Sequence, residues 1–503
     1  MDGAISTGRR TRIGVLGLDV GTGAVRGALY TEDDGRALAE AVEPLRIHGR
    51  HGRRELDVDA TWDAVETVIT RLEGAVRGRR VRVGHMAVAA TASTVAPFDA
   101  DLRPVSRALI WADHRASAEA AEVRSTRHPV LARSMGHVSP EWGLPKLIHL
   151  WRAMAASSPG RGSRGTGRVG HVLELLDWID WKLTGRLLAN AGIREWGWCV
   201  ADDGRWPADL VARLDLSAAL ELVPQESVRT GTPIGPLRTE VASRHPLLRG
   251  AMVTMGGMDS YMAALGQGVV RPGRLAASFG SSSSIVAGAE TGDGRGHLYG
   301  PFRQILPGRP DGYWHGGQSS AGLAVGWAAQ LLGRSVSELE AAAAEVIPGS
   351  DGVVFRETLL DRRTPRPEAG LRGVWDGLAL AHGPGHLFRS VLEGIAFGAR
   401  LAMEPLGPDE IVVTGGLARS RLFLTILAQA LGQPLGRLRH EAAATFGAAF
   451  AHVAERIPDL NPVEAWVAPA PRSTTLETAF QRYRALHDLP RTVAAVDPTA
   501  VAV

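Results

Sequence analysis

Cysteine and lysine are almost absent from this chain of 503 residues. Cys199 is the single cysteine, which excludes an intrachain disulfide framework and is compatible with a reducing compartment. Lys146 and Lys182 are the only lysines, so arginine supplies nearly all of the positive charge. The net charge is only +3, and scattered arginines are typical of a solvated surface. The composition therefore gives no case for a nucleic-acid partner.

Long apolar runs are also lacking, and none approaches the length of a membrane span. Arg9 and Arg10 resemble a twin-arginine export signal, but the apolar run at residues 13–18 is short and Asp19 interrupts it. We therefore expect a polar leader before a first strand, no membrane partner and a cytoplasmic location.

The chain is too long for one ordinary hydrophobic core, which predicts two or more domains. β-branched and apolar residues predict strands at residues 12–20, 25–30 and 81–91, with a glycine-rich turn between the first two. Apolar residues at helical spacing predict a helix over residues 61–77.

This pattern begins again near Ala251. A short apolar strand at residues 251–255 runs into a glycine pair, and strands at 275–278 and 284–288 flank a serine-rich turn. A helix at 386–403 and a strand at 410–414 follow. We predict two similarly built α/β domains with a boundary near residues 268–276.

The first chemical motif is the turn at residues 18–26, LDVGTGAVR. Small residues let backbone N–H groups approach phosphate oxygens, and Thr22 adds a hydroxyl. Asp19 can hold a Mg²⁺ ion through water, and Arg26 can add a charge near the phosphates. On its own such a segment is more often an ordinary glycine turn. The chain contains no GxxxxGK[ST] sequence, so a P-loop is excluded.

The second motif is Gly256-Gly257-Met258-Asp259-Ser260. A carboxylate that follows a glycine pair at a strand end can face a cleft, where Asp259 would accept a proton from a hydroxyl that attacks a γ-phosphate. An N-cap of the helix at residues 261–265 is an equally good interpretation of Asp259, and the two roles are compatible.

Three further turns of small residues follow, at residues 278–283, 316–322 and 414–420. The last runs from a strand through a glycine pair into a helix, which permits close approach of a nucleotide. Each of these turns is a weak signal alone. Five such turns in this order are much less expected by chance.

Together these segments resemble the FGGY carbohydrate kinases, of the superfamily of sugar kinases, actin and Hsp70 ATPases. The resemblance runs from about Ile13 to about Ala454 and includes "IWADHR", "LLDWIDWKLTG", "GGMDSY", "FGSSSS" and "VVTGGLARS". It implies an α/β fold of two actin-like, ribonuclease H-like domains with a central active-site cleft. It also implies an N-terminal domain at 11–272, a C-terminal nucleotide-binding domain at 273–458, and a helix with a tail at 459–503.

The resemblance implies a carbohydrate kinase that uses ATP and Mg²⁺, with Asp259 as general base and Asp19 organising the metal. Phosphate contacts would come from Gly21, Thr22, Gly23, Arg26, Gly280 and Ser281. The nucleotide side would be lined by Gly317, Gln318, Gly415, Gly416 and Ser420. The sugar side would include Ala92, Trp111, Asp113, Arg115, Arg194 and His315. Family members often form dimers, so a homodimer is one option.

The sugar is predicted to be a pentulose of the ribulose or xylulose type, because "ATASTVAPFD" and "GGQSSAG" resemble the ribulokinase branch. Two positions depart from that branch. His315 stands where those members tend to have Glu, and Arg194 where Lys is expected. Replacing an acceptor-only anion by histidine changes the hydrogen bonds offered to a substrate. A kinase for a polyol, such as a tetritol or pentitol, therefore remains an alternative.

Two other classes of function are compatible with the same fold. A non-catalytic protein that responds to sugar or nucleotide would show no ADP release with any sugar, but the presence of Asp19 and Asp259 argues against it. An actin- or Hsp70-like ATPase would hydrolyse ATP without a sugar or form filaments, and the W-x-D-x-R segment argues against that.

Overall fold

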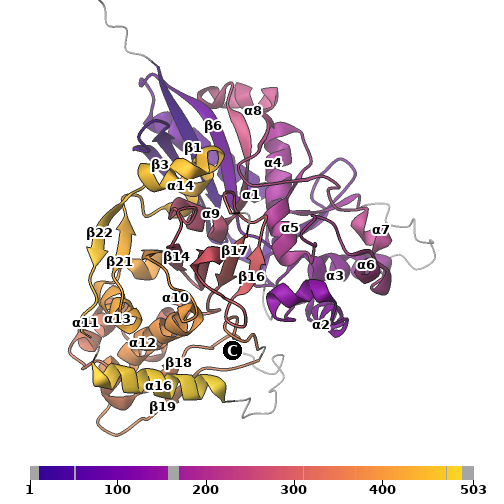
Figure 1. The fold of residues 1–503 in the computed structure, drawn as a ribbon. Helices are drawn as coiled ribbons and strands as arrows, with labels where there is room; N and C mark the ends of the chain where they lie inside the picture. The colour runs from indigo at the N-terminus through magenta and orange to yellow at the C-terminus, as the bar shows by residue number, and fades with distance from the viewer. Residues whose placement is uncertain are drawn as a thin grey trace, which may run out of the picture.

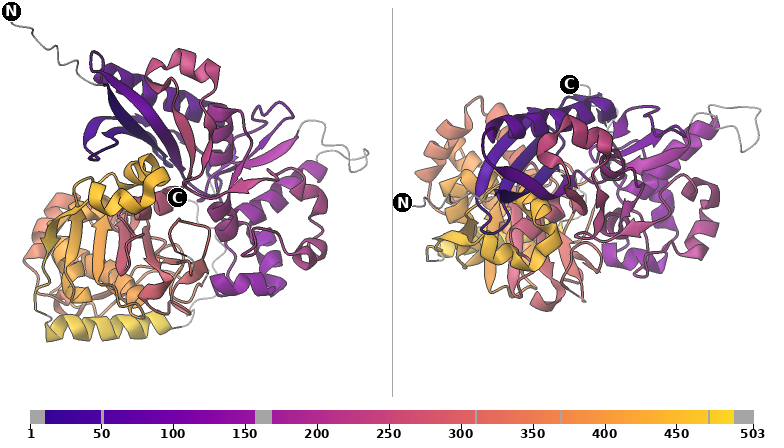
Figure 2. Two further views of the ribbon diagram at one scale, coloured as in Figure 1. Left: turned by 45° about the horizontal axis from the view of Figure 1, so that its top comes forward. Right: turned by 90° about the horizontal axis from the view of Figure 1, so that it is seen from above.

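The computed structural model describes residues 11–49, 52–156, 169–309, 311–368, 370–471 and 473–489. Two lobes of mixed α/β structure are built around two large sheets (Figure 1; Figure 2). The predicted leader and the end of the predicted C-terminal tail, residues 490–503, lie outside the described residues. Among the described residues, no helix is both long enough and apolar enough to cross a bilayer.

The first sheet has six strands in the order β12-β13-β6-β1-β2-β3. Their bounds are Pro233–Pro236, Met252–Met258, Val81–Ala90, Arg12–Val20, Ala24–Thr31 and Ala37–Pro44. β1 and β13 both run parallel to β6, while β1 and β2 form an antiparallel hairpin. The carboxyl ends of β1, β6 and β13 therefore meet at one edge of the sheet.

The second sheet has seven strands in the order β16-β17-β15-β14-β20-β21-β22. Their bounds are Tyr299–Phe302, Tyr313–Gly316, Ser283–Gly288, Arg274–Phe279, Glu410–Thr414, Leu435–Leu438 and Val463–Val467. The antiparallel hairpin β14–β15, followed by the parallel strands β20 and β21, repeats the β1–β2, β6 and β13 arrangement. The sequence prediction of two similarly built domains is confirmed.

The remaining strands form three smaller sheets among the described residues. β4, β5, β8, β7 and β9 form a five-stranded sheet at Ile47–His48, Glu55–Leu56, Ala108–Leu109, Val95–Phe98 and His171–Glu174. Two two-stranded sheets join β10 with β11 and β18 with β19, at Ala189–Asn190, Ser227–Val228, Val354–Arg356 and Val374–Asp376.

The α-helices fall into two groups along the chain. Up to the second sheet they are α1 Val58–Ala75, α2 Ser117–Ser125, α3 Gly143–Ala156, α4 Leu175–Thr184, α5 Ala191–Gly197, α6 Ala208–Arg213, α7 Ser217–Leu220, α8 Thr239–Arg244 and α9 Asp259–Gly266. The later ones are α10 Gly322–Leu331, α11 Val336–Ala344, α12 Pro384–Met403, α13 Arg421–Leu431, α14 Ala443–Ala449, α15 Ile457–Leu460 and α16 Thr474–Asp488. The helix predicted over residues 61–77 is α1, which starts earlier because Asp57 caps it and accepts a hydrogen bond from Ala60 N at 3.0 Å.

One expectation near residue 255 needs correction. The strand predicted at 251–255 is β13, which pairs with β6 in the first sheet and precedes the boundary predicted at 268–276. Asp259 is the first residue of α9 and not its N-cap, a position that Met258 occupies. The carboxylate of Asp259 accepts a hydrogen bond only from the neighbouring Ser260 N, at 2.7 Å, among the described residues.

Between β21 and β22 of the second sheet, the chain returns to the first lobe through α14 (Figure 1). Apolar side chains of α14 and α15 belong to the first hydrophobic core. Glycine makes this return possible. A Cβ atom at Gly17 would lie 1.8 Å from the Thr445 carbonyl oxygen, so α14 packs directly on the backbone of β1. At Gly447 a Cβ would lie 1.9 Å from the Met262 carbonyl oxygen, so α14 and α9 also touch backbone to backbone. The boundaries predicted at residues 272 and 458 stay predictions.

Candidate active site

Two carboxylates lie at the carboxyl edge of the first sheet. Asp19 pairs with Ala89 near the end of β1, and Asp259 follows Met258, which pairs with the next residue of β6. Burial raises the pKa of Asp19 to about 6, and Arg26 opposes this rise. Burial also raises the pKa of Asp259 to about 7, and the charge of Asp19 adds to the effect. The strand register thus brings together the two acids that the sequence singles out.

The first hairpin turn, Gly21 to Gly23, connects the acids to another predicted segment. Thr22 Oγ1 accepts a hydrogen bond from Trp111 Nε1 at 2.9 Å. Arg26 Nη1 lies 3.4 Å from Asp19 Oδ2, and the Arg26 side chain remains 54% exposed. The turn, Arg26 and Trp111 therefore lie side by side at the edge that carries Asp19.

The second hairpin turn caps a helix with its carbonyl groups. Gly280 O accepts from Gly322 N at 2.8 Å, and Ser281 O accepts from Ala321 N at 2.9 Å and from Leu323 N at 3.1 Å. These N–H groups open α10 and would otherwise lack partners. Gly280 and Ser281 are exposed, so these carbonyl contacts hold the turn in place while its residues remain accessible to solvent.

Gln318, predicted for the nucleotide side, has its side chain inside the second lobe. Its side chain is buried, accepts from Ser283 Oγ at 3.0 Å and donates to Glu357 at 2.9 Å and to the Ile395 carbonyl at 3.0 Å. All the capacity of its carboxamide nitrogen is used inside the second lobe. The structure therefore assigns the Gln318 side chain to the interior. Gly317, with φ of +142°, donates its N–H to Thr364 Oγ1 at 2.8 Å.

The turn after β20 comes very close to the end of β14. Gly415 has φ of +96°, and a Cβ there would lie 2.5 Å from the Phe279 carbonyl oxygen, so only glycine fits. A Cβ at Gly416 would meet no atom within 4 Å, which leaves that side open. Ser420 caps α13 by accepting from Phe423 N at 3.1 Å.

On the predicted sugar side, Asp113 and Arg115 bind each other. Arg115 Nη2 lies 2.7 Å from Asp113 Oδ2 and 2.7 Å from Glu55 Oε1, and Asp113 also accepts from Arg54 N at 2.9 Å. Burial alone would raise the pKa of Asp113, but the hydrogen bonds from Arg115 and from the backbone lower it overall. The Asp113 side chain has no exposed surface. This pair fixes the loop that carries Trp111.

Arg194, predicted for the sugar side, is buried in the first lobe. The guanidinium of Arg194, on α5, donates to the Pro224 carbonyl and lies 4.8 Å from the ring centre of Trp206. Burial lowers its pKa to about 10, against the opposing charges of Asp177 and Glu174. These partners hold the Arg194 side chain in the interior of the first lobe, and its predicted contact with the substrate stays a prediction.

His315, on β17, lies against the helix that begins with Asp259. Its Nδ1 is 3.1 Å from Tyr261 Oη, and its Nε2 is 3.5 Å from Ser284 Oγ. The Trp196 ring centre is 6.1 Å away. Burial lowers the pKa of His315 to about 3, so its imidazole is neutral. A neutral group that can donate as well as accept therefore occupies this position.

Several residues with no predicted role also meet here. Lys146 is fully buried and donates to the Ser93 and Ile110 carbonyls at 2.5 and 2.7 Å, which are the residues next to Ala92 and Trp111. The rarity of lysine is the only feature of the sequence that could have pointed to Lys146. An ion pair between Glu141 of the first lobe and Arg363 of the second joins the two lobes, with 3.5 Å between Glu141 Oε2 and Arg363 Nη2.

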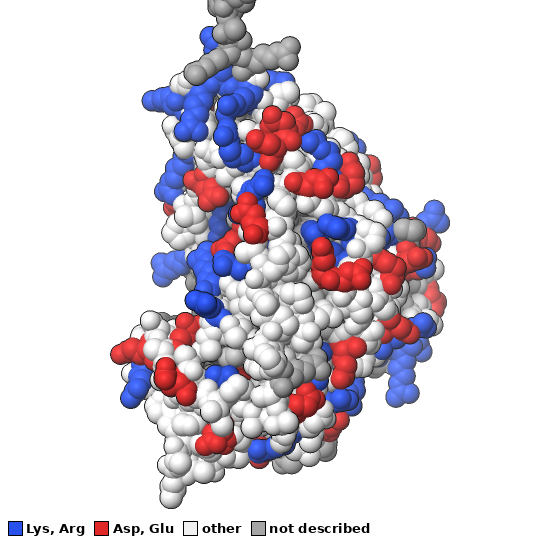
Figure 3. All heavy atoms as spheres, turned by 60° about the vertical axis from the view of Figure 1, so that its left-hand side comes forward, with Lys and Arg blue, Asp and Glu red and all other residues white. Residues whose placement is uncertain are grey.

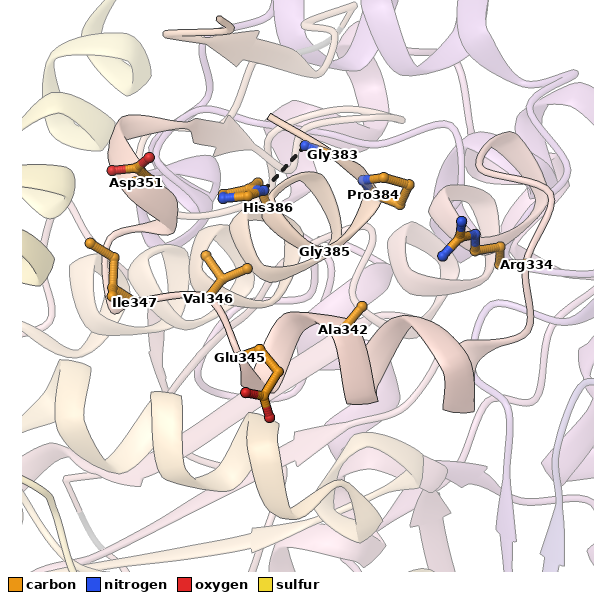
Figure 4. Close-up of a pocket in the computed structure, with 10 residues that line it drawn as sticks. All are labelled: Arg334, Ala342, Glu345, Val346, Ile347, Asp351, Gly383, Pro384, Gly385 and His386. Carbon is orange, nitrogen blue, oxygen red and sulfur yellow. Dashed lines mark hydrogen bonds between the residues drawn. The ribbon is translucent and has the colours of Figure 1, made fainter. Parts of the chain in front are cut away.

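A cavity of about 500 Å³ lies on the second lobe between α11 and α12 (Figure 4). Its lining residues are Arg334, Ala342, Glu345, Val346, Ile347, Asp351, Gly383, Pro384, Gly385 and His386. None of them belongs to the predicted site.

Basic and acidic side chains are interspersed over the face in Figure 3. The site at Asp19 and Asp259 is therefore identified by its chemistry and strand register.

Comparison with known proteins agrees with this class of fold and site. The model of the N-terminal domain of the FGGY family of carbohydrate kinases matches residues 14–266, and that of the C-terminal domain matches residues 275–454. The fold is that of the actin-like two-domain ATPases, and its class of activity is phosphoryl transfer from ATP to an alcohol group. The chain belongs to the FGGY family of carbohydrate kinases.

Individual relatives spread over several activities. A glycerol kinase from Citrifermentans bemidjiense is 29% identical over 466 residues, 87% of this chain and 89% of that protein. A ribulokinase from Geobacillus thermodenitrificans is 26% identical over 547 residues, 94% of each chain. A solved xylulose kinase from Rhodospirillum rubrum superposes with a TM-score of 0.79 and 25% identity, covering 94% of this chain and 98% of that one. These relatives agree on the family, but they include glycerol kinase, ribulokinase and xylulose kinase, so they do not decide whether the chain belongs to the predicted ribulokinase branch.

Proposed function

We propose that this kinase transfers the γ-phosphoryl group of ATP to a hydroxyl of a pentulose of the ribulose or xylulose type, with Asp259 as general base. The observation that carries the proposal is the pair of partly desolvated carboxylates, Asp19 and Asp259, at one sheet edge. A pKa of about 7 makes Asp259 able to accept a proton near neutral pH. It would take that proton from the attacking hydroxyl as the bond to phosphorus forms.

The chemistry at Asp19 fits a Mg²⁺ ion. Asp19 Oδ1 is buried and has no hydrogen-bond partner among the described residues, and carboxylate oxygens are the ligands that Mg²⁺ prefers. When bound, Mg²⁺ would neutralise charge on the phosphates. Asp19 would hold the ion through water, and the proximity of Arg26 keeps one oxygen of the carboxylate oriented.

The small-residue turns would bind the nucleotide. Backbone N–H groups of Gly21, Thr22, Gly23, Gly280 and Ser281, with the Arg26 guanidinium, are proposed for the phosphates. Gly317, Gly415 and Gly416 are proposed for the rest of the nucleotide, because glycine allows close approach there. Ser420 would act through its cap on α13, and Gln318 would support the turn from within.

For the sugar, we propose Ala92, Trp111 and His315 as the contacting residues. Asp113 and Arg115 would act by fixing the loop that carries Trp111. The hydrogen bond from Trp111 to Thr22 would connect the sugar side to the phosphate side. The ribulokinase and xylulose kinase relatives favour a pentulose.

A polyol kinase is the second candidate, favoured by one observation. His315 is neutral, so it can donate a hydrogen bond to a substrate hydroxyl or accept one from it. The Glu expected at this position could only accept a hydrogen bond and would require a donor on the substrate. The glycerol kinase relative is compatible with this candidate.

A panel assay separates these possibilities. ADP release is measured with Mg²⁺ and ATP against ribulose, xylulose, tetritols, pentitols, glycerol and hexoses. We expect the highest kcat/KM with a pentulose. A higher kcat/KM with a polyol would replace the first candidate by the second. No ADP release with any of these compounds would contradict both candidates. ADP release that needs no acceptor would indicate an ATPase instead.

A further inference from the structure

Glu32, His85 and His452 form a group at the end of the first sheet opposite to the active-site edge. Glu32 follows β2, His85 lies on β6, and His452 belongs to the 3-10 turn η6, Ala451–Arg456, after α14. His85 pairs with Val15 on β1, four positions before Asp19, which is about 13 Å along the strand. The group is therefore separate from the catalytic acids.

The geometry of these three side chains is that of converging ligands. One donor atom from each residue lies within 4.8 Å of the others. His452 Nε2 is 3.7 Å from Glu32 Oε1, and the two imidazoles stack with centres 4.0 Å apart and an angle of 8° between them. Ligand atoms about 2 Å from one metal ion lie at most about 4 Å from one another, so the group is close to that spacing.

Two nitrogens in this group are buried without a hydrogen bond among the described residues. They are His85 Nδ1 and His452 Nε2, and the His452 side chain is only 9% exposed. Leaving such atoms unpaired is costly in a folded protein, so each calls for a ligand. Two elements that are far apart in the sequence thus each bring an unpaired ring nitrogen to this group.

His452 is also prepared as a ligand by its surroundings. Its ring hydrogen-bonds to the backbone at Ala449, and since Nε2 is unpaired, Nδ1 makes that bond. A ring held in this way through its second nitrogen is typical of metal-bound histidines.

We propose that Glu32, His85 and His452 bind a divalent transition-metal ion of the zinc class, with water completing its coordination. Two imidazoles and one carboxylate suit Zn²⁺ and its neighbours, whereas Mg²⁺ prefers oxygen ligands alone. The nearby Arg456 carries a positive charge that repels a bound cation. The negative charge of the Glu32 carboxylate is therefore needed to offset this repulsion.

Such an ion joins parts of the chain that are far apart in sequence. His452 comes after the return from the second lobe, whereas Glu32 and His85 belong to the first sheet. The ion would fasten the returning segment to the sheet close to where α14 packs on β1. Its expected effect is on stability, and the distance from Asp19 predicts little effect on phosphoryl transfer.

The test uses the full-length protein without a histidine tag, stripped of metal by a chelator. Zn²⁺ is titrated by calorimetry in excess Mg²⁺, and Co²⁺ is added separately to follow its visible absorption. We expect one Zn²⁺ per chain, a higher Tm with Zn²⁺, and Co²⁺ absorption bands indicating nitrogen and oxygen ligands. Kinase activity is not needed for this readout, so failure of the proposed function would not decide it.

The variants Glu32→Gln and His452→Gln should raise the Kd for Zn²⁺ by more than about tenfold, since loss of a direct ligand exceeds the usual effect of an outer partner. His48→Gln, at a half-buried histidine on β4, is the matched control and should bind as the unchanged protein does. If His452→Gln does not fold, Glu32→Gln alone decides. Absence of one-to-one Zn²⁺ binding, or equal Kd values for Glu32→Gln and the unchanged protein, would overturn the proposal.

Discussion

Replacing Asp259 by Asn should abolish sugar phosphorylation and at the same time stabilise the protein at alkaline pH. The catalytic effect follows from loss of the proposed base and should be at least ~10²-fold in kcat. The stabilising effect follows from the raised pKa of Asp259, because the folded protein holds a proton that the unfolded chain has already released.

The magnitude can be worked out from that pKa. A rise from 3.8 to about 7 corresponds to roughly 4 kcal/mol once the carboxyl is fully ionised. Asp259 is only half-buried, so solvent screening reduces the expected gain in the free energy of unfolding to about 2 kcal/mol. Because the folded pKa is the higher one, the stability of the unchanged protein falls as pH rises from about 4 to about 7. The gain from Asn is then complete at pH 8 and, by the same relation, roughly a third as large at pH 5.

Urea unfolding without nucleotide at these two pH values measures the effect. Asp113→Asn is the matched control, since hydrogen bonds lower the pKa of Asp113 and its loss should destabilise the protein at pH 8. The reasoning is refuted if Asp259→Asn lowers the midpoint at pH 8 or shifts it equally at both pH values. Near-normal turnover of the variant would refute its role as base.

Three further substitutions test the packing around the site. Lys146→Met should raise the KM for the sugar more than the KM for ATP, because two loop carbonyls lose their donor, and steady-state kinetics with each substrate varied will show this. Arg194→Lys should leave the sugar KM unchanged while lowering Tm, since its contacts are internal; a large rise in KM would contradict this placement. Gly17→Ala should destabilise the protein by at least ~2 kcal/mol in urea unfolding, because its Cβ would overlap the Thr445 carbonyl. An unchanged midpoint would show that α14 can shift.

Local patterns in the sequence predicted the strands and the acids well. The strands predicted at residues 12–20 and 410–414 have those bounds in the structure, because β-branched runs there end at glycine turns. Asp19 lies near the end of β1 and Asp259 directly follows β13, and since parallel strands end at one edge, the register brings these two acids together. Features of this kind depend on neighbours in sequence.

Side-chain directions could not be predicted in the same way. Arg194 was expected at the sugar, yet its partners Pro224 and Trp206 belong to other segments and hold it in the interior. Gln318 sits in a turn that suits a nucleotide, but its carboxamide bonds to Glu357 inside the lobe. The return of α14 to the first lobe depends on backbone contacts that single glycines permit. No sequence pattern indicates which segment such a glycine will contact.

Lys146 shows why a chain so rich in arginine keeps a lysine at this one buried place. Its ammonium group points at the carbonyls of Ser93 and Ile110, and at that of Leu109 at 3.4 Å. Three acceptors around a single nitrogen suit the three donors of an ammonium, whereas the planar guanidinium spreads its donors over a wider fork. Burial lowers the pKa of Lys146 and raises that of Glu174, and the charge of each residue opposes the shift of the other. The two loops that Lys146 joins carry Ala92 and Trp111, so the position of the proposed sugar contacts depends on this one buried lysine.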